Sequence, residues 1–339
     1  MDSSLKSQNN IGVLLISHGS SLAIASKTFD EIHTLFKEAT DYITEVGYMK
    51  VAEPSLSKAI ENIVSKDDSI QRIIAMPVFL AQGIHTNIDI PLILGLNPKE
   101  VDPRFPDGNY PKDFYLGDLK PINFDGNIEL LDPIGPDPLL LEIIKKRVAT
   151  ALEESKIDTS PDKTGILIIS HGSRLNYNRE FITDVFNQYK SISDYVVGQG
   201  FMELMEPTIP QAVNKLVENN DLDRLIAVPV FIAPGVHTTR DIPTILGLIK
   251  DDSVDDHSHH HHDHSSHSNS HSSAGDSHNH GSPSHSHSHG SSSHSHGHHH
   301  HHHEKIEFDG EVLYTDPIGA DSILIEIIKQ RVENQIKDS

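Results

Sequence analysis

Four histidines recur in pairs at matched places along this chain of 339 residues. His18 follows the apolar run IGVLLIS and His171 follows TGILIIS, while His85 stands in VFLAQGIHTNIDIP and His237 in VFIAPGVHTTRDIP. The first pair is spaced by 153 residues and the second by 152. Imidazole is the commonest metal ligand in proteins and a natural general base near neutral pH. The paired positions therefore predict two related sites for metal or proton chemistry.

A third matched position lies between the two histidines of each pair. It is Glu203, in FMELMEP, in the second half of the chain and Lys50, in YMKVAEP, in the first half. One carboxylate with two imidazoles leaves a coordination position open, which is typical of working metal sites. We therefore predict that His171, Glu203 and His237 form a complete metal site. His18 and His85 are predicted to be the corresponding ligands of an altered site, because a charged lysine cannot bind a cation.

The remaining histidines are distributed very differently. Of the 26 histidines, 21 lie between His257 and His303, in a segment of Ser, His, Gly and Asp with almost no apolar residues. Such a composition cannot form a core, so residues 253–303 are predicted to be a disordered insert. Dense imidazole suits cobalt, nickel, copper and zinc, so we expect this insert to buffer or deliver metal. The one other histidine, His33, stands opposite Phe186 and is expected to be an ordinary polar residue.

Composition and motifs exclude several other chemistries. The chain has no cysteine, and its formal charge of -22 argues against a nucleic-acid partner. No G-x-S-x-G elbow, phosphate-binding loop or dinucleotide fingerprint is present, so Ser20 and Ser173 are expected to be turn or cap residues. No apolar run approaches the roughly 20 residues of a membrane span, and the N-terminus does not resemble a signal peptide. The expected location is the cytoplasm.

The histidines must be positioned by two copies of one α/β unit. Matched segments run throughout the chain, and they predict domains at 11–155 and 164–339, the second interrupted by the insert. In the first copy, strands are expected at 11–17, 46–52, 72–81 and 128–134. Helices are expected at about 25–45, from Pro54, over 89–96 and over 138–148. This alternation predicts two parallel four-stranded sheets flanked by helices, with all four histidines beyond the carboxyl ends of strands, where such sheets bind ligands.

The pattern LLISHGS, LIISHGS, FMELMEP, VFLAQGIHTNIDIP and VFIAPGVHTTRDIP, taken together, resembles the class II tetrapyrrole chelatases. It is most similar to the sirohydrochlorin cobaltochelatase family of the CbiX type, in its long form with two chelatase-like domains. The resemblance implies insertion of Co²⁺ into sirohydrochlorin without ATP, for corrinoid (cobalamin) synthesis, with Ni²⁺ or Fe²⁺ insertion as the alternative. It implies no cofactor beyond the substrate metal. The fused duplication replaces a dimer and so predicts a monomer, without nucleic-acid or membrane partners.

The resemblance also implies roles for particular residues. The macrocycle must lose two pyrrole protons, and His171, or His18 in the first half, is the expected base. The loops 81–84 and 233–236 are expected to line the macrocycle, and three cations are candidates for its carboxylates. These substrate-binding candidates are Ala81, Gln82, Gly83, Ile84, Ala233, Pro234, Gly235, Val236, Lys50, Arg174 and Arg240. The alternative of a different class is a metal-storage protein or metallochaperone that uses the insert and performs no chemistry.

Overall fold

The computed structural model describes residues 10–173, 175–249 and 304–338. The predicted disordered insert at 253–303 and the candidate Arg174 lie outside these residues. Within the described ranges, no helix is both long enough and apolar enough to cross a membrane.

Each repeat folds into one sheet of four parallel strands. The spatial order of the first sheet is β2 (Ile43–Tyr48), β1 (Ile11–Ser17), β3 (Arg72–Pro77) and β4 (Asn127–Leu130). The second sheet has the same order, with β6 (Val196–Phe201), β5 (Thr164–Ser170), β7 (Arg224–Pro229) and β8 (Glu311–Tyr314). The central strands β1 and β5 are buried along their whole length, as strands covered on both faces should be. The predicted α/β class with two parallel sheets is confirmed.

The helices follow the strands in the same order in both repeats. The long helices are α2 (Ala23–Ala39), α3 (Leu56–Lys66), α5 (Pro138–Glu154), α6 (Asn176–Ile192), α7 (Ile209–Asn219) and α9 (Ser322–Asp338). Two π-helical turns, η1 (His85–Asp89) and η3 (His237–Asp241), lead into the short helices α4 (Ile90–Ile93) and α8 (Ile242–Ile245). A short 3₁₀ turn, η2 (Pro161–Lys163), precedes β5.

Several predicted bounds were wrong in the first repeat. The second strand ends at Tyr48, before Lys50, and the third ends at Pro77. The helix expected from Pro54 begins at Leu56, because the side chain of Ser55 caps it by accepting a hydrogen bond from the backbone N–H of Lys58. Long apolar runs therefore continue beyond the strands and into the loops at the functional edge of the sheet.

Alternate residues of β1 pack into different layers. Leu14 and Ile16 face a core that contains Ile60 of α3, whereas Val13 and Leu15 face a larger core. This larger core continues through both repeats, since it also contains buried residues of α5, α6 and α9. The shared core fixes the two sheets against each other and so determines how their functional edges meet.

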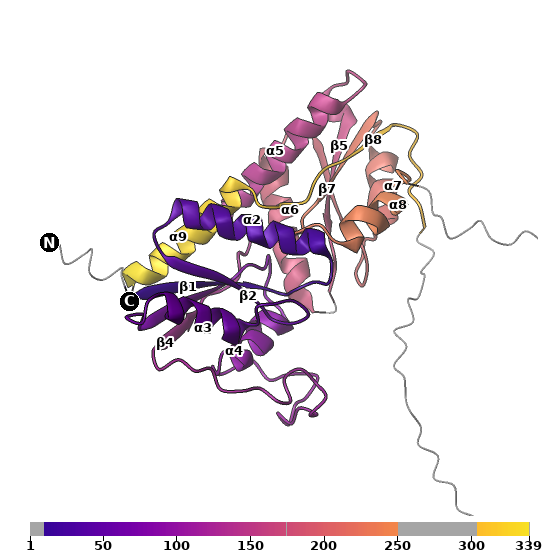
Figure 1. The fold of residues 1–339 in the computed structure, drawn as a ribbon. Helices are drawn as coiled ribbons and strands as arrows, with labels where there is room; N and C mark the ends of the chain where they lie inside the picture. The colour runs from indigo at the N-terminus through magenta and orange to yellow at the C-terminus, as the bar shows by residue number, and fades with distance from the viewer. Residues whose placement is uncertain (1–9, 174, 250–303, 339) are drawn as a thin grey trace, which may run out of the picture. The chain divides into compact units, whose positions relative to one another are not determined.

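The last helix of each repeat packs on the sheet of the other repeat. Helix α9 contacts α2 and β3 of the first repeat, while α5 contacts α6 and β7 of the second (Figure 1). The two exchanged helices also contact each other. The sheet of each repeat is therefore covered by a helix from the other repeat. The domain bounds at 155 and 164, which follow the repeats in the sequence, stay a prediction.

Polar contacts hold the exchanged helices in place. Arg147 of α5 donates hydrogen bonds to the carbonyl oxygens of Pro317, at 3.1 Å, and Ile318, at 2.6 Å. Arg331 of α9 makes the matching bond to the carbonyl oxygen of Ile134, at 2.6 Å. Charged donors to carbonyl groups are among the stronger hydrogen bonds. Each exchanged helix is thus held by an arginine that donates to a backbone carbonyl oxygen of the other repeat.

Acid should weaken this junction through Asp321, which is 6% exposed and bonds Lys146 at 2.7 Å. Burial alone would raise the pKa of Asp321, but hydrogen bonds from Lys146 and the backbone N–H of Ile323 outweigh it and lower the pKa. A lowered folded-state pKa gives stability that is present above about pH 4 and lost as pH falls through the folded value. We expect Asp321→Asn to cost about 1–2 kcal/mol at pH 7.

Urea unfolding at pH 7 and pH 3 checks this prediction. The difference between wild type and Asp321→Asn should be smaller at pH 3 than at pH 7, because the carboxylate of Asp321 takes up its proton as pH falls through its lowered pKa. Asp316→Asn, at an exposed position close by, is the control and should change little at either pH. An equal loss at both pH values for Asp321→Asn would show that the charge of Asp321 is not what stabilises the junction.

Candidate metal centre

Three potential ligands of the second repeat meet at the carboxyl edge of its sheet. His171 directly follows β5, Glu203 follows β6 by two residues, and His237 opens η3 beyond β7. The imidazole rings of the two histidines are 4.7 Å apart between centroids. His171 Nε2 lies 3.5 Å from Glu203 Oε1, and one ligand atom from each of the three residues lies within 4.8 Å of the others. This geometry brings the predicted His-Glu-His set together.

Both histidines are oriented through Nδ1. His171 Nδ1 lies 3.1 Å from the carbonyl oxygen of Gly172, and His237 Nδ1 lies 2.8 Å from Asp241 Oδ2. Because these oxygens accept, the Nδ1 proton donates and the Nε2 lone pair remains available for a metal. Asp241 was missed by the sequence analysis, although the spacing His-x-x-x-Asp occurs in both repeats and could have revealed it. A carboxylate behind a ligating imidazole is a common support of metal sites.

The electrostatics of the site favour neutral imidazole. Burial lowers the pKa of His171, and the neighbouring His237 lowers it further, against the opposing effects of the Gly172 carbonyl and Glu203. A neutral imidazole is the form that binds metal. With the Glu203 carboxylate beside it, the site offers two neutral donors and one negative charge, a set that suits a divalent cation with one position left open.

We expect Asp241→Asn to weaken the binding of a divalent cation at this site by about 10-fold, because loss of a charged partner of a ligating histidine typically weakens metal binding 10- to 100-fold. Calorimetric titration of the variant and of wild type with a divalent cation checks this expectation, since any binding elsewhere in the chain is common to both. Arg240→Gln is the control, since Arg240 pairs with the other oxygen of Asp241 at 2.9 Å from an exposed position. It should leave the Kd for the cation within about 3-fold. Equal effects of both changes would contradict a specific role for the His237–Asp241 bond.

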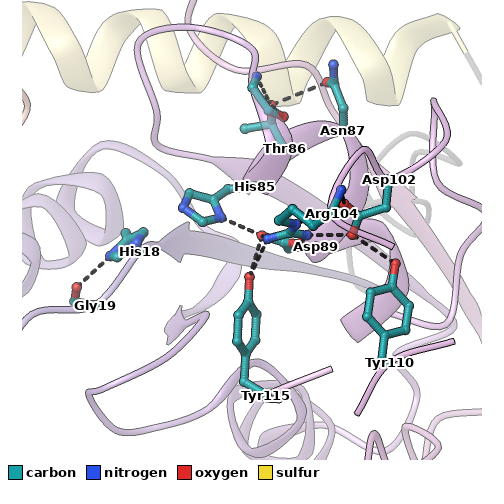
Figure 2. A network of polar contacts seen from close by, with 11 residues as sticks. His18, Gly19, His85, Thr86, Asn87, Asp89, Asp102, Arg104, Tyr110 and Tyr115 are labelled. Carbon is teal, nitrogen blue, oxygen red and sulfur yellow. Dashed lines mark hydrogen bonds and ion pairs between the residues drawn. The ribbon is translucent and has the colours of Figure 1, made fainter. Parts of the chain in front are cut away.

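The first repeat holds its histidine pair in nearly the same way (Figure 2). The rings of His18 and His85 are 4.9 Å apart between centroids. His18 Nδ1 lies 2.9 Å from the carbonyl oxygen of Gly19, and His85 Nδ1 bonds Asp89, the counterpart of Asp241. Burial lowers the pKa of His18, against the opposing effect of the Gly19 carbonyl, and the charge of Lys50 lowers it further. Among the described residues, this repeat forms no group of three potential metal ligands.

A network that sequence analysis missed surrounds Asp89 (Figure 2). Arg104 forms an ion pair with Asp89 and also bonds Asp102 at 2.7 Å, while the Tyr115 hydroxyl donates to Asp89 at 2.6 Å. Burial alone would raise the pKa of Asp89, but hydrogen bonds from His85, Arg104 and Tyr115 outweigh it and lower the pKa. Arg104 and Tyr115 come from the irregular segment 97–126, for which no motif gave a signal. This network therefore orients Asp89, the hydrogen-bond partner of His85.

A cleft of about 720 Å³ is lined by residues of both repeats. His18, His85, His171 and His237 all line it, as does Arg104. Of the predicted macrocycle loops, seven positions line the cleft: Ala81, Gln82, Gly83, Ile84, Ala233, Pro234 and Gly235. The pocket-lining residues do not include Val236, Lys50 or Arg240. The two histidine pairs therefore open on one cavity with largely apolar loops beside them.

Ser20, Ser173 and His33 have the ordinary structural roles that the sequence predicts for them. Ser20 Oγ and Ser173 Oγ each accept a hydrogen bond from the backbone N–H two residues further along, at 3.1 Å, so both are turn residues. His33 Nε2 lies 2.9 Å from the carbonyl oxygen of Thr44 in an adjacent strand, as an ordinary hydrogen-bonded histidine would. Ser20 and Ser173 also line the cleft, but their hydroxyl groups are engaged in these turns.

The sequence matches the model of the CbiX family twice, over residues 12–151 and 165–335. The chain belongs to the CbiX family. Sirohydrochlorin cobaltochelatase of Methanothermobacter thermautotrophicus is 40% identical to this CbiX-family chain over 174 residues, which are 51% of this chain and 94% of the relative. Sirohydrochlorin cobaltochelatase of Methanopyrus kandleri is 34% identical over 145 residues, or 42% of this chain and 99% of the relative. Each relative thus corresponds to about half of this chain.

Solved structures resemble the CbiX-family chain along nearly its whole length. SirB from Bacillus subtilis with Fe³⁺ has a TM-score of 0.60 at 14% identity and covers 97% of this chain and 96% of its own. The sirohydrochlorin chelatase SirB from Bacillus subtilis in complex with cobalt has a TM-score of 0.57 at 13% identity, with the same coverage. At such low identity the likeness shows the fold alone.

Proposed function

We propose that this chain is a chelatase that inserts Co²⁺ into sirohydrochlorin without ATP, in the synthesis of corrinoids. The observation that carries the proposal is the convergence of His171, Glu203 and His237, of which the two histidines line a cleft shared by both repeats. Membership of the CbiX family and the names of its relatives support the reaction. Insertion of Ni²⁺ or Fe²⁺ into the same macrocycle is the alternative, because imidazole and carboxylate do not distinguish these metals.

The substrate metal would bind first to His171, Glu203 and His237. Three protein ligands leave a coordination position open, which a pyrrole nitrogen of the macrocycle can occupy. The carboxylate of Glu203 offsets part of the charge of the metal ion. The ion can then bind at this site and still be released to the macrocycle. The cleft loops 81–84 and 233–235 would hold the macrocycle beside the ion.

Proton release follows from the same residues. Insertion forms bonds from the metal to the macrocycle and displaces two pyrrole N–H protons, so the charge on the macrocycle is unchanged. As the metal leaves His171 and His237, each Nε2 regains a lone pair and can accept one proton. Because burial and the second imidazole lower the pKa of His171, its proton passes readily to water. His171 thus acts as ligand and then as base, with His237 as the second acceptor, and His18, which lines the same cleft, is the alternative base.

The first repeat would bind the macrocycle rather than a metal. Lys50 places an ammonium group where the second repeat has the Glu203 carboxylate, which repels a divalent cation. Lys50 is then a candidate partner for the peripheral carboxylates of sirohydrochlorin, whereas Arg104 is already paired with Asp89 and Asp102. This proposal assigns one metal site to the chain and gives the two repeats different tasks.

Anaerobic mixing of the protein with sirohydrochlorin and Co²⁺, without ATP, tests the function. The absorbance of the macrocycle should change faster than in a protein-free control, and the ranking of Co²⁺, Ni²⁺ and Fe²⁺ gives the metal preference. Absence of any acceleration with all three metals would overturn the chelatase proposal and favour metal storage.

The histidine-rich segment 253–303 is proposed to supply metal to the cleft. Its deletion should lower the insertion rate at limiting cobalt and leave the rate at saturating cobalt unchanged. An unchanged rate at limiting cobalt would remove the delivery role.

A further inference from the structure

Two matched residues, one after the candidate ligand Glu203 and one after Lys50, have an unusual backbone conformation. Val51 has φ of +70° and Leu204 has φ of +64°. Within the described part of the chain, they are the two non-glycine residues with positive φ. They are separated by 153 residues, the spacing of the first histidine pair, and they directly follow Lys50 and Glu203. The unusual conformation is therefore repeated at the same place in both copies of the fold.

Fold stability does not explain the residue types at these positions. The left-handed region is unfavourable for residues with a Cβ atom, most of all for β-branched ones, and it is commonly occupied by glycine or asparagine. Burial does not compensate, since Val51 is 70% exposed and Leu204 is 55% exposed. Two apolar side chains are thus exposed to solvent at positions where the backbone conformation is unfavourable. Backbone strain of this kind is concentrated at functional sites.

The backbone geometry itself has a clear purpose. The N–H of Glu203 donates to the carbonyl oxygen of His171 at 3.1 Å, and Lys50 does the same to His18 at 3.2 Å. A Cβ atom on Gly172 would lie 1.9 Å from the Glu203 carbonyl oxygen, so the two segments are in close contact. The turn therefore places residue 203 against the strand-end histidine. Glycine or asparagine could adopt the same turn, so the turn itself does not require an apolar side chain.

We propose that Leu204 and Val51 contact the apolar face of the bound macrocycle and position it at the metal. The inference rests on the proposed function. A conjugated tetrapyrrole presents flat apolar faces and a charged rim, and apolar side chains beside the metal would favour the approach of such a face. Val236, which directly precedes the candidate ligand His237, is likewise an exposed apolar residue, with 38% of its surface accessible. Because Leu204, Val51 and Val236 are not among the residues that line the cleft, the proposed contact is made at its rim.

The test compares Leu204→Asn with Leu204→Met. Asparagine tolerates the left-handed conformation and leaves Glu203 in place, so thermal unfolding should occur at the same temperature as in wild type or higher. Titration with metal-free sirohydrochlorin, followed by fluorescence, should show Kd raised about 10-fold for Leu204→Asn, since an apolar contact is lost. Leu204→Met keeps an apolar side chain and should stay within about 3-fold of wild type. Unchanged or raised stability together with weaker binding is a combination that a purely structural role cannot give.

Other outcomes would overturn the inference. Wild-type affinity in Leu204→Asn, or equal losses in both variants, would show that no apolar contact to the macrocycle is made. A change in sedimentation behaviour with unchanged Kd would assign Leu204 to an interface between protein chains. If wild type inserts cobalt and Leu204→Asn binds normally, this inference fails alone. If wild type does not bind sirohydrochlorin, the proposed function fails with it.

Discussion

His171→Ala is expected to lower the rate of cobalt insertion by at least ~100-fold, because it removes one of three ligands and the nearest proton acceptor. His18→Ala is the matched control and should cost less than ~10-fold. Both histidines directly follow the central strand of their sheet, both are half-buried, and both bond the carbonyl oxygen of the next glycine through Nδ1. The two variants therefore perturb folding alike and differ mainly in the group at the third position, Glu203 or Lys50.

Initial rates at saturating sirohydrochlorin and varied cobalt would separate the two variants. The loss in His171→Ala should appear in both kcat and the KM for cobalt, since a ligand and a base are removed together. His18→Ala should affect the binding of sirohydrochlorin more than the binding of cobalt. Equal losses in the two variants would mean that both repeats insert metal, and a larger loss in His18→Ala would transfer the metal site to the first repeat.

The histidine pairs could be predicted because the duplication marks them. A single histidine after an apolar run has many explanations, but the same residue at the same place in two copies has few. The duplication also made the order of strands and helices predictable, since the same pattern occurs in both copies. That order places all four histidines beyond the carboxyl ends of parallel strands. The positions of His171, Glu203 and His237 therefore followed from sequence pattern together with the general geometry of parallel sheets.

Other parts of the structure carry no comparable signal. The amphipathic pattern of α9 shows that one face is buried, but it does not say which sheet that face covers, and α9 covers the first. Asp89 and Asp241 stand at the same spacing after a histidine in both repeats, but that spacing brings the two side chains into contact only because each pair lies on a helical turn, η1 or η3. Arg104 and Tyr115 come from an irregular loop, where position depends on the packing of the whole segment and not on a period in the sequence.

Restoring the carboxylate in the first repeat should create a second working site. We expect Lys50→Glu to raise insertion by the inactive His171→Ala variant by at least ~10-fold, because a His-Glu-His set suits a divalent ion. The rest of the site is already present. The centroids of the paired rings lie 4.9 Å apart in the first repeat and 4.7 Å in the second, and His85 bonds Asp89 as His237 bonds Asp241. What the first repeat lacks is the negative charge between its histidines.

Lys50→Gln in the same His171→Ala background separates ligation from simple removal of a positive charge. Glutamine removes the ammonium group that repels the metal, but an amide is a weaker ligand than a carboxylate, so it should restore much less activity than glutamate. Equal recovery with both residues would mean that repulsion by Lys50 alone closes the first site. No recovery with either, in a protein that still binds sirohydrochlorin, would place the cause in the Arg104 network around Asp89, which holds His85 in a way that the second repeat does not reproduce.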